Sequence, residues 1–172
     1  KMNSIVEELM LFAQVRSGEV VKKPLEMSVI VHEVLHRLEY DQQSQATIIL
    51  MDSWPAAWGY APWVEEVWVN LITNAIKYGG RPPRVELGGE QLTAETARFW
   101  VRDNGAGISP ELINRLFSPL THLPNMRGGG HGLGLSIVRR IIQKLGGQVS
   151  VESNQAARPG SVFYFTLPTG QG

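Results

Sequence analysis

The sequence predicts an α+β fold, namely a two-layer α/β sandwich in which helices cover one face of a mixed sheet. Segments with helical and with strand periodicity are mixed along the chain, as a sandwich of this kind requires. The last two segments are both strands, which breaks the strict alternation of a doubly wound sheet. Hydrophobic residues make up 43% and charged residues 19% of the 172 residues, so one domain with a real core and a short appendage is expected.

Four elements are expected in the first 51 residues. An apolar stripe predicts a helix over residues 3–16, which Ser17-Gly18 ends. Residues 19–27 are extended. Ser28 is positioned to cap a second helix that runs to about residue 44. A short apolar strand follows at residues 46–51.

The rest of the chain begins with a helix that Pro62 opens and that runs to Tyr78. Gly146-Gly147 ends another helix, which starts at residue 133 and runs to residue 145. The other expected elements are strands at 84–87, 97–102, 148–153 and 161–167, a short helix at 110–117, and a Pro- and Gly-rich loop at 118–131.

Charge and cysteine content exclude several functions. The formal net charge is +0, so no global basic field would attract nucleic acid, and no nucleic-acid partner is expected. The chain has no cysteine, which excludes disulfides, thiolate zinc sites and cysteine nucleophiles. No apolar run approaches the roughly 20 residues that span a bilayer. A cytoplasmic location is expected, and membrane attachment of a longer parent protein stays open.

The helix at residues 62–78 carries a polar stripe opposite its apolar face. Glu66, Asn70, Asn74 and Lys77 follow one another at spacings of four, four and three residues. One interpretation is a solvated face. The other is a metal–phosphate site, since asparagine carbonyls suit Mg²⁺ and a lysine holds phosphate as a point charge.

Two glycine-bearing loops follow this helix. The first loop is Asp103-Asn104-Gly105-Ala106-Gly107. One interpretation is an ordinary turn. In the other, the Asp103 carboxylate accepts a hydrogen bond from an exocyclic amine, and the glycines let the backbone approach a flat base closely. The segment from Gly128 to Leu135 is either a linker or a helix N-terminus that binds phosphate. It matches neither the dinucleotide fingerprint nor the P-loop.

Together, in this order, the motifs resemble those of the GHKL superfamily, which includes gyrase-type topoisomerases, a heat-shock chaperone, histidine kinases and a mismatch-repair ATPase. The resemblance covers roughly residues 28–168 and implies the GHKL sandwich fold. Its motifs are the N box at Asn70-Leu71-Ile72-Thr73-Asn74-Ala75-Ile76-Lys77-Tyr78, the first glycine box at Asp103-Asn104-Gly105-Ala106-Gly107-Ile108, the F box at Leu116-Phe117-Ser118-Pro119-Leu120, the second glycine box from Gly130 to Val138, and a closing strand from Gly160 to Pro168.

The resemblance implies ATP and Mg²⁺ as cofactors and assigns residues to them. Asn74, with Asn70 on the same face, would coordinate magnesium, and Lys77 would contact phosphates. Asp103 would bind the adenine amino group. The remaining nucleotide-binding positions would be Tyr78, Gly105, Gly107, Ile108, Gly130, Gly132, Leu133, Gly134 and Thr166.

The loop at 118–131 would form a lid over the nucleotide. Arg127 in it either stabilises the transferring phosphoryl group or is a solvated loop charge. Two residues depart from the family pattern: Leu120 replaces a second phenylalanine of the F box, and His131 stands inside the second glycine box.

The N box favours a kinase over a hydrolase. ATP-hydrolysing members of the superfamily carry a glutamate where this chain has Asn70, and asparagine cannot act as a base toward water. The nucleophile would then be a histidine on a helical hairpin. We reject His32-Glu33 as the accepting site, because the residues after it do not fit the phosphoacceptor motif and His32 falls on the domain's own helix, on a surface.

Residues 1–18 resemble the end of the dimerisation hairpin's second helix, and residues 19–172 the ATP-binding domain. The stripe Ile5-Leu9-Phe12 would pack in a homodimeric bundle, or alternatively against the domain's own core. The implied function is the catalytic domain of a two-component sensor histidine kinase, with its own hairpin and a downstream response regulator as partners. A nucleotide-sensing module without transfer activity and a serine-directed GHKL kinase are the alternatives.

Overall fold

The computed structural model describes residues 6, 9–11, 13–15, 18–39, 45–117, 134–154 and 160–170. Its elements are β1 (Lys23–Leu25), α2 (Met27–Glu39), β2 (Thr47–Leu50), β3 (Ala57–Gly59), α3 (Ala61–Tyr78), β4 (Arg84–Gln91), β5 (Thr96–Arg102), α4 (Pro110–Ile113), α5 (Gly134–Lys144), β6 (Val149–Asn154) and β7 (Gly160–Pro168).

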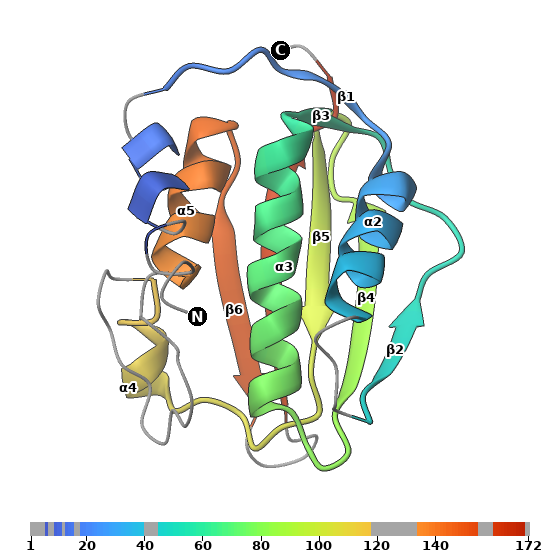
Figure 1. Cartoon of the computed structure of the whole chain (residues 1–172), viewed down its shortest axis with the longest axis vertical. Coiled ribbons are helices and arrows are strands. Elements are labelled where there is room, and N and C mark those ends of the chain that lie inside the picture. Colours follow the sequence, from blue (N-terminus) through green and yellow to red (C-terminus); the bar gives the residue numbers. More distant parts are fainter. Residues whose placement is uncertain are drawn as a thin grey trace.

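The main sheet has five strands in the order β2-β4-β5-β7-β6, and a small antiparallel sheet joins β1 to β3. The pair β2–β4 is parallel, whereas β4–β5, β5–β7 and β6–β7 are antiparallel. Helices α2, α3 and α5 lie side by side in front of this sheet, with α3 in the middle (Figure 1). The predicted α+β sandwich with a mixed sheet and helices on one face is therefore confirmed.

Side-chain alternation along β5 separates the core from the open face of the sheet. Ala97, Phe99 and Val101 are fully buried, while the residues between them face away from the helices. Trp68 of α3 packs edge-on against Phe99 and Phe165, with ring centroids 6.3 and 5.1 Å apart. The centre of the core is thus an aromatic cluster between α3 and the two middle strands.

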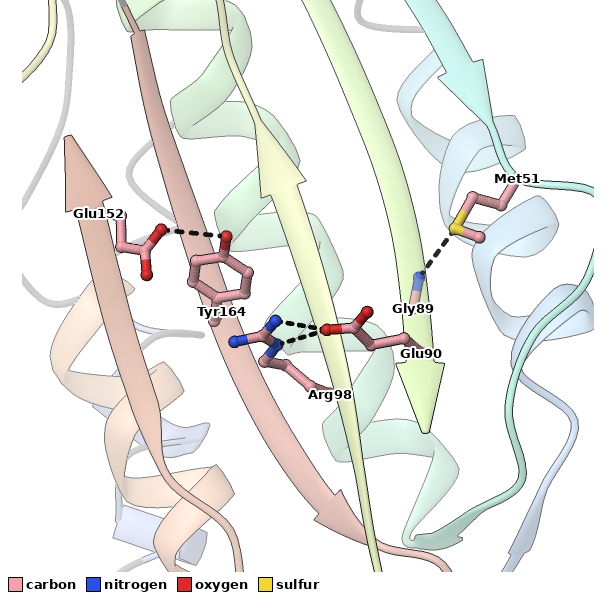
Figure 2. A network of polar contacts seen from close by, with 6 residues as sticks. All are labelled: Met51, Gly89, Glu90, Arg98, Glu152 and Tyr164. Carbon is pink, nitrogen blue, oxygen red and sulfur yellow. Dashed lines mark hydrogen bonds and ion pairs between the residues drawn. The ribbon is translucent and has the colours of Figure 1, made fainter. Parts of the chain in front are cut away.

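The open face carries polar and aromatic groups that satisfy one another. Arg98 lies between Glu90, with which it forms an ion pair, and Tyr164, whose ring centroid is 4.6 Å from its guanidinium carbon (Figure 2). The Tyr164 hydroxyl donates to Glu152 at 3.3 Å. Exposed pairs of this kind contribute little to stability, so the network mainly keeps this face polar.

Two strand predictions and one cap prediction were wrong. Helix α2 starts at Met27, so Ser28 lies within its first turn instead of capping it. Strand β3 was not expected, and β4 continues to Gln91 although its predicted end was residue 87. The reason is that Gly88 does not end the strand: a Cβ there would lie 2.4 Å from the Trp100 ring, so the glycine makes room for that ring.

His32 is exposed on α2, as predicted, and its Nδ1–H donates to the Ser28 carbonyl at 2.6 Å. None of the described helices has both the length and the hydropathy needed to cross a membrane.

The N-terminal segment contacts the domain core through part of its surface. Val15 is fully buried and Leu11 packs against the core. Val6, Leu9 and Met10 are 55%, 51% and 58% exposed. Leu9 of the predicted stripe is thus exposed, whereas Ile5 and Phe12 lie outside the described residues. The boundary after residue 18 remains a prediction.

Candidate functional site

Helix α3 supplies one wall of the candidate site. Tyr60 is its N-cap and Pro62 lies in its first turn, where the missing N–H of proline is tolerated. Its buried face is the predicted apolar one, which comprises Trp63, Val64, Val67, Trp68, Leu71, Ile72 and Ala75. On the polar stripe Glu66, Asn70 and Asn74 are half-buried, and only Lys77 is exposed. The stripe is therefore mostly covered by protein and is not a freely solvated face.

A cavity of about 170 Å³ opens beside α3. It brings together α3, the loop after β5, the start of α5 and strand β7, which are far apart in the sequence. Its lining residues are Asn74, Tyr78, Asp103, Gly107, Ile108, Ser109, Leu112, Leu135, Ser161 and Phe163. The wall combines apolar side chains with the Asp103 carboxylate, the Asn74 amide and the hydroxyls of Tyr78, Ser109 and Ser161, and such a mixture is common in sites that bind a flat organic ligand.

Asp103 is the buried carboxylate of this cavity, at 9% exposure. Its Oδ1 accepts backbone hydrogen bonds from Gly105 at 2.9 Å and from Ser161 at 3.2 Å. Burial raises the pKa of this carboxyl, and the two backbone hydrogen bonds partly oppose the rise. Within the described part of the chain no donor reaches Oδ2. Asp103 therefore offers a ligand one fixed, desolvated acceptor.

Glycines shape the loop that follows Asp103. A Cβ on Gly105 would lie 2.1 Å from the Tyr78 carbonyl oxygen, so only glycine lets the loop rest against the end of α3. Gly107 has a φ of 85°, which side chains with a Cβ rarely adopt. The next residue, Ile108, is held by a 2.6 Å hydrogen bond from its N–H to Ser153 Oγ.

Ser153 and Ser161 are site residues that the sequence did not reveal. Ser153 Oγ lies 3.2 Å from both the Gly160 carbonyl and Ser161 Oγ. The Asp103 N–H donates to the Ser161 carbonyl at 2.9 Å. These contacts join the first glycine box to the ends of β6 and β7. No local sequence pattern predicts these contacts, because Ile108 and Ser153 are 45 residues apart in the chain.

Asn70 lies behind the cavity wall. Its Nδ2 donates to the Glu66 carbonyl at 2.8 Å, and a Cβ on Gly134 would lie 2.6 Å from its Oδ1. The close approach of Gly134 thus sets the start of α5 against the polar stripe. The Glu66 carboxylate instead pairs with Arg37 at 3.2 Å and does not line the cavity.

The other predicted site residues fall into three groups. Lys77 borders a separate hollow of about 390 Å³ formed with Gln45 and the loop at residues 79–83. Thr166 alternates with the buried residues of β7, so it faces away from the cavity, and its hydroxyl accepts from the Gln148 N–H at 2.9 Å. Outside the described residues lie Arg127, Gly130, Gly132, Leu133, the predicted lid, Leu120 and His131.

No cluster of three or more metal-ligating His, Cys, Asp or Glu side chains occurs among the described residues. Amide oxygens are also ligands that a hard cation accepts, and α3 carries two amides, Asn70 and Asn74.

The fold and the cavity agree with a known family. The profile of the Histidine kinase-, DNA gyrase B-, and HSP90-like ATPase family matches residues 59–171. This span includes α3, both sides of the cavity and the closing strand. The chain therefore belongs to this family of ATP-binding domains.

Similar proteins narrow the class further. The methanogenesis regulatory histidine kinase FilI of Methanothrix harundinacea is 37% identical over 174 residues, which cover 98% of this chain and 19% of FilI. The chain spans about a fifth of the length of FilI and of cyanobacterial phytochrome B of Nostoc, another relative that is 33% identical. Within the family, the chain is a catalytic domain of the histidine kinase type.

Two solved structures share the fold. Full-length ShkA in complex with AMPPNP superposes with a TM-score of 0.78 at 22% identity, over 98% of this chain and 36% of ShkA. The histidine kinase ThkA in complex with the response regulator TrrA gives a TM-score of 0.73 at 22% identity, over 98% and 49% of the two chains.

Proposed function

We propose that this domain binds Mg²⁺-ATP in the cavity beside α3 and transfers the γ-phosphate to a histidine on a separate helical hairpin. The observation that carries the proposal is the convergence of Asn74, Tyr78 and Asp103 on one cavity. These residues come from two of the motifs that resemble the histidine kinase boxes.

The adenine part of ATP fits the cavity. The desolvated Asp103 carboxylate is an acceptor for the exocyclic amine, and its backbone hydrogen bonds fix its direction. Apolar side chains, including Ile108, Leu135 and Phe163, offer faces for a flat base. Burial raises the pKa of the Tyr78 phenol, so Tyr78 flanks the ligand as a neutral group.

Magnesium fits the amide oxygens of α3. Asn74 lines the cavity and would offer its amide oxygen to the cation. Asn70 lies one turn earlier, outside the cavity lining, with its Nδ2 donating to the Glu66 carbonyl and its Oδ1 beside Gly134 at the start of α5. That oxygen would be the second amide ligand. Bound Mg²⁺ would neutralise charge on the phosphates. Lys77 and, from the predicted lid, Arg127 would then contribute positive charge toward the phosphate tail. Gly130, Gly132, Leu133 and Gly134 would offer backbone N–H groups.

The described site contains no base positioned to activate water. Asn70 is an amide whose nitrogen donates to its own helix, and Glu66 is ion-paired to Arg37 away from the cavity. An incoming imidazole nitrogen would form the bond to the γ-phosphorus as the bond to the β-phosphate oxygen breaks and ADP leaves. The chain's own task is to bind and orient ATP.

The partners proposed are the protein's own dimerisation hairpin, in a homodimer, and a response regulator downstream, in the cytoplasm. The complex of ThkA with the response regulator TrrA, whose histidine kinase shares this fold, supports the second partner.

The proposal is tested by supplying the hairpin domain of the full-length protein separately, with γ-labelled ATP and Mg²⁺. We expect labelling of the hairpin by an acid-labile, alkali-stable bond, as a phosphohistidine gives, and its loss in Asn74→Asp. Nucleotide binding without any transfer would identify a nucleotide-sensing module instead, and an acid-stable product would identify a serine-directed kinase.

A further inference from the structure

Asn104 follows the adenine-binding candidate Asp103 directly, yet its side chain points to a different part of the molecule. Its Oδ1 accepts backbone hydrogen bonds from Gly80 and from Arg84, each at 2.8 Å. Its Nδ2 donates to the Pro82 carbonyl at 3.1 Å. One amide therefore satisfies two backbone groups of the loop that links α3 to β4 and one of the first residue of β4.

The loop is built to let this amide in. A Cβ on Gly80 would lie 2.8 Å from both Nδ2 and the carbonyl oxygen of Asn104, so a side chain there would push the loop away. The loop begins directly after Tyr78 at the end of α3. Asn104 thereby fixes the end of the helix that carries Asn74 and Lys77 to the end of the strand that delivers Asp103.

We infer that Asn104 is a positioning residue that aligns the adenine-binding and phosphate-binding halves of the nucleotide site. The inference rests on the proposed function. In the proposed function Asp103 belongs to the half of the site that binds the base, and Asn74 of α3 belongs to the half that binds magnesium and phosphate. Only a ligand that contacts both halves of the site depends on their relative placement. Once the base of such a ligand is bound, its phosphates bind without a further loss of translational freedom, provided that the phosphate half is correctly placed.

The test compares a spanning ligand with a part of it. Affinities for Mg²⁺-AMPPNP and for adenosine are measured by NMR titration in the unmodified chain, Asn104→Ala and Gly80→Ala. We expect AMPPNP affinity to fall about tenfold in both variants, the effect of one or two lost hydrogen bonds, with adenosine affinity unchanged. Asn104→Asp keeps an acceptor for the Gly80 and Arg84 N–H groups and should recover most of the loss.

The control is Gln143→Ala, which removes an exposed amide side chain of α5 and should leave both affinities unchanged. Equal loss of adenosine and AMPPNP affinity in Asn104→Ala would mean a general structural role and would overturn the inference, as would unchanged AMPPNP affinity. Failure of the unmodified chain to bind either ligand would instead refute the proposed function, and the inference with it.

Discussion

At the scale of single residues, Asp103 is the buried carboxylate of the candidate cavity. Burial raises the pKa of its carboxyl above the ordinary value of 3.8, because water is removed from the charged form. Without a ligand, the charged form of this carboxyl is less favourable in the folded domain than in the unfolded chain. The free energy of unfolding that Asp103 contributes is therefore fully present below pH 3.8 and is lost as the pH rises through the raised pKa.

Nucleotide binding should show the opposite pH dependence. An amine that donates to Asp103 favours the carboxylate, so binding lowers its pKa and releases protons. We predict that affinity for Mg²⁺-AMPPNP is constant at neutral pH and falls on acidification through the raised pKa, approaching tenfold per pH unit below it. Calorimetric titrations at a series of pH values from about 8 down to about 4 measure this, because that range ends just above the ordinary carboxyl pKa of 3.8.

The matched control is Asp103→Asn, in which protonation of the ligand itself is retained and the carboxyl is removed. Plots of the affinity for Mg²⁺-AMPPNP against pH should differ in slope between the two chains only in the acidic range. Identical slopes throughout would show that Asp103 does not titrate in contact with the nucleotide.

Single residues also show what the sequence could and could not predict of the site. Asn74, Tyr78 and Asp103 were predicted because each motif is local, and the structure brings them to one cavity. The role of Asn104 was missed, since its three partners precede it by about twenty residues and the motif alone fits an ordinary turn. Thr166 was assigned to the site through the family resemblance, whereas the side-chain alternation along β7 turns it to the other face of the sheet.

At the scale of elements, helix α3 joins the core to the site. Its apolar face was predictable from the 3.6-residue period, and the buried residues follow that period without exception. The length of β4 was not predictable in this way. Two consecutive glycines, Gly88-Gly89, are typical of a turn when the sequence is read alone. In the structure Gly88 is paired with Trp100 of β5, and its missing side chain leaves room for the Trp100 ring.

Trp68 is the residue through which α3 should matter most for stability. It is fully buried among Trp54, Phe99 and Phe165, and its Nε1–H donates to Met27 Sδ at 3.2 Å. Trp68→Ala should lower the free energy of unfolding by about 3–5 kcal/mol, as large core truncations do. Urea denaturation measures this. Trp100→Ala, on the half-buried open face, should lose clearly less, and an equal loss would contradict the assigned core.

At the scale of the whole molecule, the N-terminal segment before residue 18 contacts the core of the domain. Val15 is fully buried although it precedes the predicted boundary at residue 18, while Val6 is 55% exposed. Val15 is thus part of the buried core cluster, and the boundary at residue 18 remains a prediction. An apolar stripe alone cannot say which neighbour covers it.

The two valines make a matched pair. Val15→Ala removes buried methyl groups and should destabilise the chain by about 1–2 kcal/mol. Val6→Ala should change stability by less than about 0.5 kcal/mol. Thermal unfolding at one fixed protein concentration tests both. If Val15→Ala were as stable as Val6→Ala and the unmodified chain, Val15 would not belong to the cooperative core of the domain.

The central claim is that the cavity beside α3, whose wall contains Asp103 and Asn74, holds Mg²⁺-ATP. Its most direct test is a calorimetric titration of Mg²⁺-AMPPNP into the unmodified chain, Asp103→Ala and the exposed-loop control Asp52→Ala. The unmodified chain and Asp52→Ala should bind equally, and Asp103→Ala should give no binding at concentrations that saturate them. Undiminished affinity in Asp103→Ala would contradict the claim.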